Sequence, residues 1–92
     1  MPIVRIPGAL RTLTGGADEV IVAATTVRDA LAELDRVHPG IGARLLDGGM
    51  VKPFIRIYVG ADDIGALAGL DTNVGDRDEI AIVPAIAGGR DA

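Results

Sequence analysis

The sequence predicts an α+β fold in which a mixed sheet of four to five strands packs on one main helix. Four short segments rich in β-branched residues indicate the strands, and a single segment with helical periodicity lies between the second and third of them. The chain has 92 residues, of which 49% are hydrophobic, so it can build one small core without disulfides or metals. We expect residues 1–84 to form one domain and residues 85–92 to form a flexible, extended C-terminal tail.

The N-terminal part predicts a wide hairpin. Residues 2–7 (PIVRIP) alternate between two faces and have a proline at each end, which is typical of a short strand. Residues 8–17 end in a Gly-Gly pair and are expected to form a loop. Residues 18–24 (DEVIVAA) are rich in β-branched side chains and predict the second strand.

The main helix is expected to begin after Thr26 and to end before Pro39-Gly40. Thr26 is followed three residues later by Asp29, a pattern typical of a helix N-cap. The apolar residues then recur with a helical period, at Val27, Ala30, Leu31, Leu34 and Val37. Residues 41–47 can add one short turn.

Residues 51–59 (VKPFIRIYV) predict the third strand, because their apolar and polar side chains alternate. The side chains expected to face the helix are Ile55, Ile57 and Val59. The opposite face is expected to carry Lys52, Phe54, Arg56 and Tyr58. This second set includes both aromatic residues of the chain, so it fits either a half-exposed sheet face or a protein contact surface.

Residues 60–78 are expected to be mostly loop, residues 79–83 (EIAIV) form the last strand, and Pro84 ends it. A hairpin, a crossover helix and a strand that returns beside the first describe a β-grasp roll. Periodicity alone leaves the order of the strands open.

The composition excludes several kinds of function. The chain has no cysteine, no serine and one histidine, so we expect no metal site and no Cys- or Ser-based nucleophile. The net charge is −4 and no basic run exists, which argues against nucleic-acid binding. No apolar run is long enough to span a membrane and no signal peptide is evident, so a cytoplasmic location is expected.

The C-terminal tail contains the most informative motif. Six residues lead from Pro84 to Gly89, a length of about 20 Å when extended. Because Gly88 and Gly89 have no β-carbon, Ala87-Gly88-Gly89 can thread a narrow channel and present a carboxylate in the site of another enzyme. A merely flexible end is the alternative. The residues expected to contact the partner are Phe54, Arg56, Tyr58, Pro84 and Ile86.

Several stretches resemble the ubiquitin-like sulfur carrier proteins, a family that includes the small subunit of molybdopterin synthase and the thiamine-pathway carrier. The similarity is greatest to carriers that serve an O-phosphoserine-dependent cysteine synthase. These stretches are IPGALRTLTGG (6–16), HPGIGARLLD (38–47), FIRIYVGADDI (54–64) and GLDTNVGDRDEIAIVPAIAGG (69–89). The resemblance implies a ubiquitin-like β-grasp roll.

The resemblance also implies a reaction. An E1-like enzyme would use ATP and Mg²⁺ to adenylate the carboxylate of Gly89, because a carboxylate itself is a poor electrophile. A sulfur donor would convert the adenylate to a thiocarboxylate, and a partner synthase would use that sulfur to make cysteine, a thiosugar or another metabolite. The chain would then be a cosubstrate that binds no cofactor, and not an enzyme.

Arg90-Asp91-Ala92 follow the Gly-Gly pair, so the free carboxylate of the full chain belongs to Ala92. We therefore expect a protease, in this family typically a JAMM-type zinc enzyme, to cut between Gly89 and Arg90. Two alternatives stay open. The chain could be a modifier that is joined through Gly89 to lysines of other proteins, or it could be a binding module whose tail is merely flexible.

Overall fold

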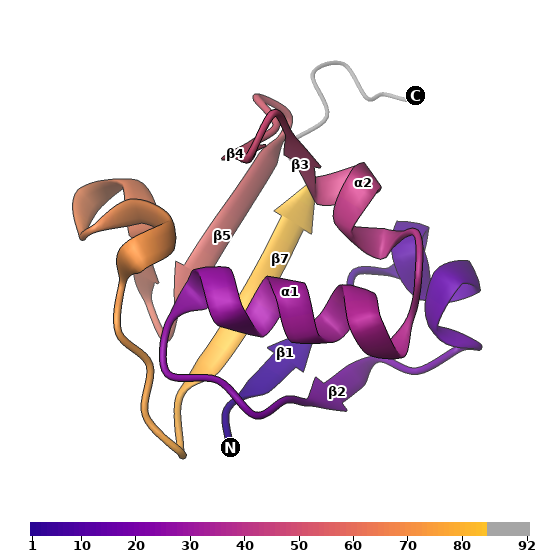
Figure 1. Cartoon of the computed structure of the whole chain (residues 1–92), viewed down its shortest axis with the longest axis horizontal. Coiled ribbons are helices and arrows are strands. Elements are labelled where there is room, and N and C mark those ends of the chain that lie inside the picture. Colours follow the sequence, from indigo (N-terminus) through magenta and orange to yellow (C-terminus); the bar gives the residue numbers. More distant parts are fainter. Residues whose placement is uncertain (85–92) are drawn as a thin grey trace.

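The structure is a computed structural model that describes residues 1–84 (Figure 1). The main sheet has five strands in the order β2-β1-β7-β5-β6. These strands are β1 (Ile3–Arg5), β2 (Glu19–Ile21), β5 (Ile55–Val59), β6 (Asp62–Asp63) and β7 (Glu79–Pro84). A separate hairpin consists of β3 (Leu46–Asp47) and β4 (Met50–Val51). The helices are α1 (Val27–Val37), α2 (Ile41–Leu45) and the 3₁₀ helices η1 (Gly8–Thr14), η2 (Ile64–Ala66) and η3 (Gly69–Asp71).

The last strand, β7, lies in the middle of the sheet. It runs parallel to β1, with Val4 opposite Ile80, and antiparallel to β5, with Ile57 opposite Ile82. β2 pairs with β1 as the predicted hairpin. α1 crosses one face of this mixed sheet (Figure 1), so the architecture is the predicted β-grasp roll.

The core lies between α1 and the sheet. Thr26 caps α1 as predicted, because its side-chain oxygen accepts the N–H of Asp29 at 3.1 Å. Four of the five predicted apolar positions of the helix are buried, and they pack with Val4, Ile57 and Ile80 from the sheet. Val37 is the exception, because it is the last residue of the helix and is 45% exposed, so the predicted apolar stripe is buried only as far as Leu34.

Residues 8–17 contain a helix where a loop was expected. η1 buries Leu10 and Thr14, and the hydroxyl of Thr14 donates to the carbonyl of Ala17 at 2.8 Å. Gly15 ends this helix with a φ of 66°, a left-handed conformation that glycine adopts without strain. The helical conformation buries the apolar side chain of Leu10 and also the hydroxyl of Thr14, which keeps a hydrogen bond.

The third strand of the main sheet begins at Ile55 and not at residue 51. Val51 belongs to the β3–β4 hairpin, whose turn is formed by Gly48 and Gly49 with φ values of 62° and 81°. Two successive positive φ angles define a tight hairpin turn that favours glycine. Pro53 and Phe54 then form a second turn, closed by the N–H of Ile55, which donates to the carbonyl of Lys52 at 3.0 Å. Residues 51–54 therefore cannot continue the strand.

Residues 60–78 contain the short strand β6 and the two 3₁₀ helices η2 and η3. The side chain of Asp63 accepts the N–H of Gly65 at 2.8 Å and so caps η2. Ile64 is buried and Leu70 packs against the core, which anchors this otherwise irregular segment beside β5.

Candidate functional site

The end of β7 is the point where the C-terminal tail leaves the domain. Pro84 is the last residue of β7 and lies opposite Ile55 of β5. The N–H of Gly60 donates to the carbonyl of Glu79 at 2.9 Å. Because backbone groups alternate in direction along a strand, Pro84 then directs its nitrogen away from β5, toward the side where β1 has already ended. The prediction that Pro84 ends the strand at residue 83 is wrong, because β7 includes Pro84. Proline is tolerated there because its missing N–H would not have donated to β5.

We use the name root patch for Phe54, Arg56, Tyr58 and Val83, which lie in the turn before β5, on β5 and next to the last residue of β7. Arg56 and Val83 are opposite one another in the β5–β7 register. Arg56 and Tyr58 lie on the face of β5 opposite Ile57, which is buried against the core, so their predicted outward orientation is confirmed. Phe54 is 60% exposed, but it belongs to the turn before β5 rather than to the strand.

Val83 was not predicted as a contact residue. It is 42% exposed and adds an apolar side chain beside Arg56. The signal was present in the sequence, because Ile80 and Ile82 alternate with Ala81 and Val83 in the last strand. The pairing of that strand with β5, which brings Val83 next to Arg56, is a property of the tertiary structure.

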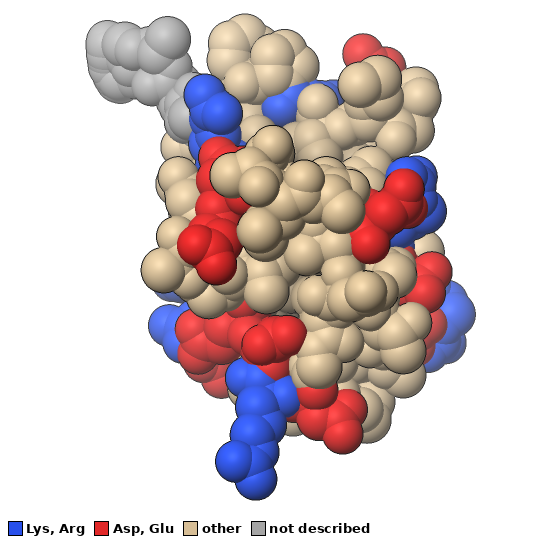
Figure 2. Space-filling model, turned by 90° about the vertical axis from the view of Figure 1, so that its left-hand side faces the viewer, with Lys and Arg blue, Asp and Glu red and all other residues tan. Residues whose placement is uncertain are grey.

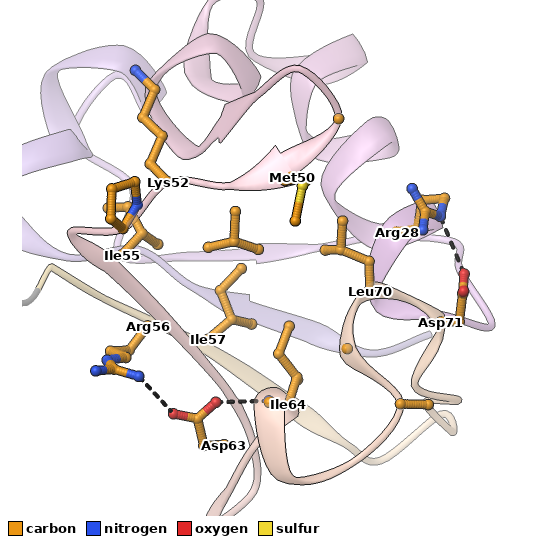
Figure 3. Close-up of a pocket in the computed structure, with 16 residues that line it drawn as sticks. Arg28, Met50, Lys52, Ile55, Arg56, Ile57, Asp63, Ile64, Leu70 and Asp71 are labelled. Atoms are coloured by element: carbon orange, nitrogen blue, oxygen red, sulfur yellow. Dashed lines mark hydrogen bonds and ion pairs between the residues drawn. The ribbon is translucent and has the colours of Figure 1, made fainter.

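Lys52 does not lie with the root patch. It lines a groove of about 540 Å³ that runs between the β3–β4 hairpin and the segment containing η2 and η3 (Figure 3). Ile57, Ile64 and Leu70 point into this groove, while the amine of Lys52 points away from it. Neither the groove nor its lining was predicted from the sequence, because its walls come from three separate segments.

Two ion pairs flank the groove (Figure 3). Arg28 of α1 lies 3.2 Å from Asp71, and Arg56 lies 3.7 Å from Asp63. Figure 2 shows this side of the molecule as an uncharged band with acidic and basic side chains along both margins. The exposed fractions of these four side chains range from 32% to 74%, and ion pairs between such exposed groups contribute little to stability.

The shifted pKa values lie away from the root patch. A hydrogen bond from Arg36 lowers the pKa of Glu33, and the same bond raises the pKa of Arg36. A hydrogen bond from the Met1 ammonium lowers the pKa of Asp76. Within residues 1–84, no group of three His, Cys, Asp or Glu side chains is placed to hold a metal ion. No helix in that same range is long and apolar enough to cross a membrane.

Five of the predicted site residues lie outside the described residues. They are Ile86, Ala87, Gly88, Gly89 and Arg90. Of the others, Phe54 lies in the turn before β5, Arg56 and Tyr58 lie on β5, and Pro84 ends β7 opposite Ile55. Arg56 and Tyr58 share the outward face of β5, whereas Pro84, which is paired with Ile55, has its side chain on the opposite face of the sheet.

A β-grasp sheet whose central last strand leads directly into a Gly-Gly tail defines a ubiquitin-like protein. The family comparison matches residues 4–89 to the ThiS family. The chain therefore belongs to the ThiS family of ubiquitin-like sulfur carrier proteins.

Among curated relatives, sulfur carrier protein CysO of Mycobacterium tuberculosis is 37% identical over 89 residues, covering 94% of this chain and 96% of the relative. Small archaeal modifier protein 3 of Haloferax volcanii is 33% identical over 64 residues, or 70% of each chain.

Solved structures agree with these relatives. A chain of the Amycolatopsis orientalis BexX/CysO complex matches with a TM-score of 0.92 and 38% identity, over 97% of this chain and 100% of that chain. Small archaeal modifier protein 1 of Methanosarcina acetivorans matches with a TM-score of 0.84 and 27% identity, over 96% of this chain and 95% of that chain. The neighbours thus include both sulfur carriers and protein modifiers.

Proposed function

We propose that this chain is a sulfur carrier whose Gly89 carboxylate is converted to a thiocarboxylate after removal of Arg90-Asp91-Ala92. The observation that carries the proposal is the joint position of two features. The root patch includes Val83, the residue before the last one of β7, and the family match continues through the tail and stops at Gly89. A partner that holds the root patch is therefore also close to Pro84, from which the sequence continues to Gly88-Gly89.

The chemistry needs two steps at the Gly89 carboxyl group, the first at an oxygen and the second at the carbon. In an E1-like enzyme, a carboxylate oxygen attacks the α-phosphorus of Mg²⁺-bound ATP, and pyrophosphate leaves. A sulfide equivalent then attacks the acyl carbon, the bond to AMP breaks, and a thiocarboxylate results. ATP and Mg²⁺ belong to the enzyme, and the carrier contributes only its tail and its docking surface. The chain acts as a cosubstrate without its own active site.

The thiocarboxylate sulfur passes from the carrier to the product in the active site of a partner synthase. The A. orientalis relative was solved in a complex with BexX, and the mycobacterial relatives are named CysO. By analogy, the partner here is a synthase that accepts the thiocarboxylate as a sulfur nucleophile and makes cysteine, a thiosugar or another sulfur metabolite.

Intact-mass analysis tests the proposal. The full chain and a chain that ends at Gly89 are each incubated with a candidate E1-like enzyme, ATP, Mg²⁺ and sulfide. We expect the Gly89-ended chain alone to gain the mass difference of one oxygen replaced by sulfur. Adding a JAMM-type protease should make the full chain competent by removing its last three residues. Sulfuration of the uncut full chain would contradict the trimming step.

The second candidate function is protein modification. The similarity to small archaeal modifier proteins 1 and 3 favours it, because the same activated Gly89 can acylate a lysine. Affinity-tagged chain ending at Gly89, expressed in cells that lack its sulfur acceptor, should be recovered as a ladder of isopeptide-linked proteins if this function holds. Recovery of only the free thiocarboxylate would support the carrier.

A further inference from the structure

The groove between the β3–β4 hairpin and the segment containing η2 and η3 lies on the helix side of β5, whereas Tyr58 of the root patch lies on the other face. Its floor is apolar, because Ile57, Ile64 and Leu70 point into it (Figure 3). Met50 of the hairpin is part of the wall and is 71% exposed. The volume of about 540 Å³ lies within the range of about 300–1,000 Å³ that is typical of ligand sites. The groove can therefore receive apolar side chains of a partner.

The charge of the groove differs from that of the rest of the chain. Its lining includes three of the nine basic side chains but only two of the thirteen acidic ones. These five residues are Arg28, Lys52, Arg56, Asp63 and Asp71. The lining thus carries a formal charge of +1 in a chain whose net charge is −4, so all other side chains together carry −5. An acidic partner is attracted here and repelled by most of the remaining surface.

The two arginines at the flanks of the groove retain hydrogen-bond donors. A guanidinium group has five N–H donors. Arg28 donates from Nε to Asp71 at 3.2 Å, and its terminal nitrogens make no hydrogen bond within residues 1–84. Arg56 lies 3.7 Å from Asp63, which is too long for a hydrogen bond. Both arginine side chains are more than half exposed, and their planar donor groups match carboxylates.

We propose that this groove binds an acidic segment of a partner protein, in which carboxylates flank apolar side chains. The apolar side chains pack on Leu70 and Met50, and the carboxylates accept hydrogen bonds from Arg28 and Arg56 (Figure 3). Because these arginines belong to different elements, α1 and β5, a ligand needs more than one carboxylate to use both, as a peptide segment has. The inference goes beyond the proposed function and does not depend on it, since no step involves Gly89.

Peptide binding to the full chain, measured by titration calorimetry at low salt, tests the proposal. The probe is an acetylated and amidated peptide, Glu-Glu-Leu-Val-Leu-Glu-Glu, and the control peptide has lysine in place of every glutamate. We expect the acidic peptide to bind with a Kd below about 1 mM, more weakly as salt is added, and the lysine peptide to bind at least about tenfold more weakly.

Three outcomes of this titration would overturn the proposal. One is a Kd above about 1 mM for the acidic peptide, and another is equal binding of the acidic and the lysine peptides. The third is competition by octanoate at the affinity of the acidic peptide, which would assign the groove to small amphiphilic anions.

Two matched pairs of variants locate the binding. Ala68→Glu places a carboxylate in the groove and should weaken binding at least about tenfold, whereas Leu67→Glu changes the exposed neighbour that does not line the groove and should leave the Kd unchanged. Arg28→Gln should raise the Kd about 2- to 5-fold. Arg36→Gln, on the same helix and also in an exposed ion pair, should change it less than about twofold.

Urea unfolding of each variant shows whether it remains folded under the conditions of the titration. Equal losses of affinity within either pair of folded variants would contradict the proposed site. None of these results bears on sulfuration of Gly89, so the failure of this inference and the failure of the proposed function are distinguishable.

Discussion

Truncation of Phe54 gives the sharpest test of the root patch as a docking surface. Full burial of a phenylalanine side chain is worth about 1.5–3 kcal/mol. Phe54 is 60% exposed in the free chain. A partner that covers this exposed part of the side chain gains about 1–2 kcal/mol, or about 5- to 30-fold in affinity. Because Phe54 contributes little to the core, Phe54→Ala should change the free energy of unfolding by less than about 0.5 kcal/mol.

The assay is adenylation of the Gly89-ended chain by an E1-like enzyme, measured as kcat/KM for the carrier. Phe54→Ala should lower kcat/KM by about 5- to 30-fold, chiefly through KM. Ile21→Ala is the matched control, because Ile21 is 62% exposed but lies on the edge strand β2, three strand positions from β5. If Ile21→Ala and Phe54→Ala had equal effects, or if Phe54→Ala had none, the assignment of the docking surface would be refuted.

Three further predictions concern the fold. Thr26→Ala removes the acceptor for the Asp29 N–H and should cost about 1 kcal/mol in urea unfolding, with Thr25→Ala as a near-neutral control; equal stabilities would refute the cap. Ile57→Ala, at a position 1% exposed, should cost about 2–5 kcal/mol, and a loss below about 1 kcal/mol would show that the groove collapses to refill the site. Because the Met1 ammonium lowers the pKa of Asp76 from its usual 3.8, that ion pair stabilises the fold above this pH and is lost as pH falls through the lowered pKa. Asp76→Asn should therefore lower stability at neutral pH and flatten its acid dependence, as unfolding at a series of pH values would reveal.

The sequence patterns predicted the elements that have strong local signals. The predicted start of the helix after Thr26 and its end before Pro39-Gly40 are confirmed, since α1 runs from Val27 to Val37. The failures occurred where several local choices compete. Residues 51–54 alternate like a strand, but the Gly48-Gly49 turn takes Val51 into a hairpin and Pro53 introduces a second turn.

The sequence by itself determined the helix, most of the strands and the Gly-Gly tail, because periodicity and a terminal motif are properties of the chain, and its resemblance to sulfur carriers implied the ubiquitin-like class. The tertiary structure decided which of these features meet. Strand pairing over long sequence separations places Val83 beside Arg56 and Pro84 opposite Ile55. Such pairings depend on the order of the strands in the sheet. That order is determined by how the whole sheet buries its apolar face against α1, and no short sequence segment determines it alone.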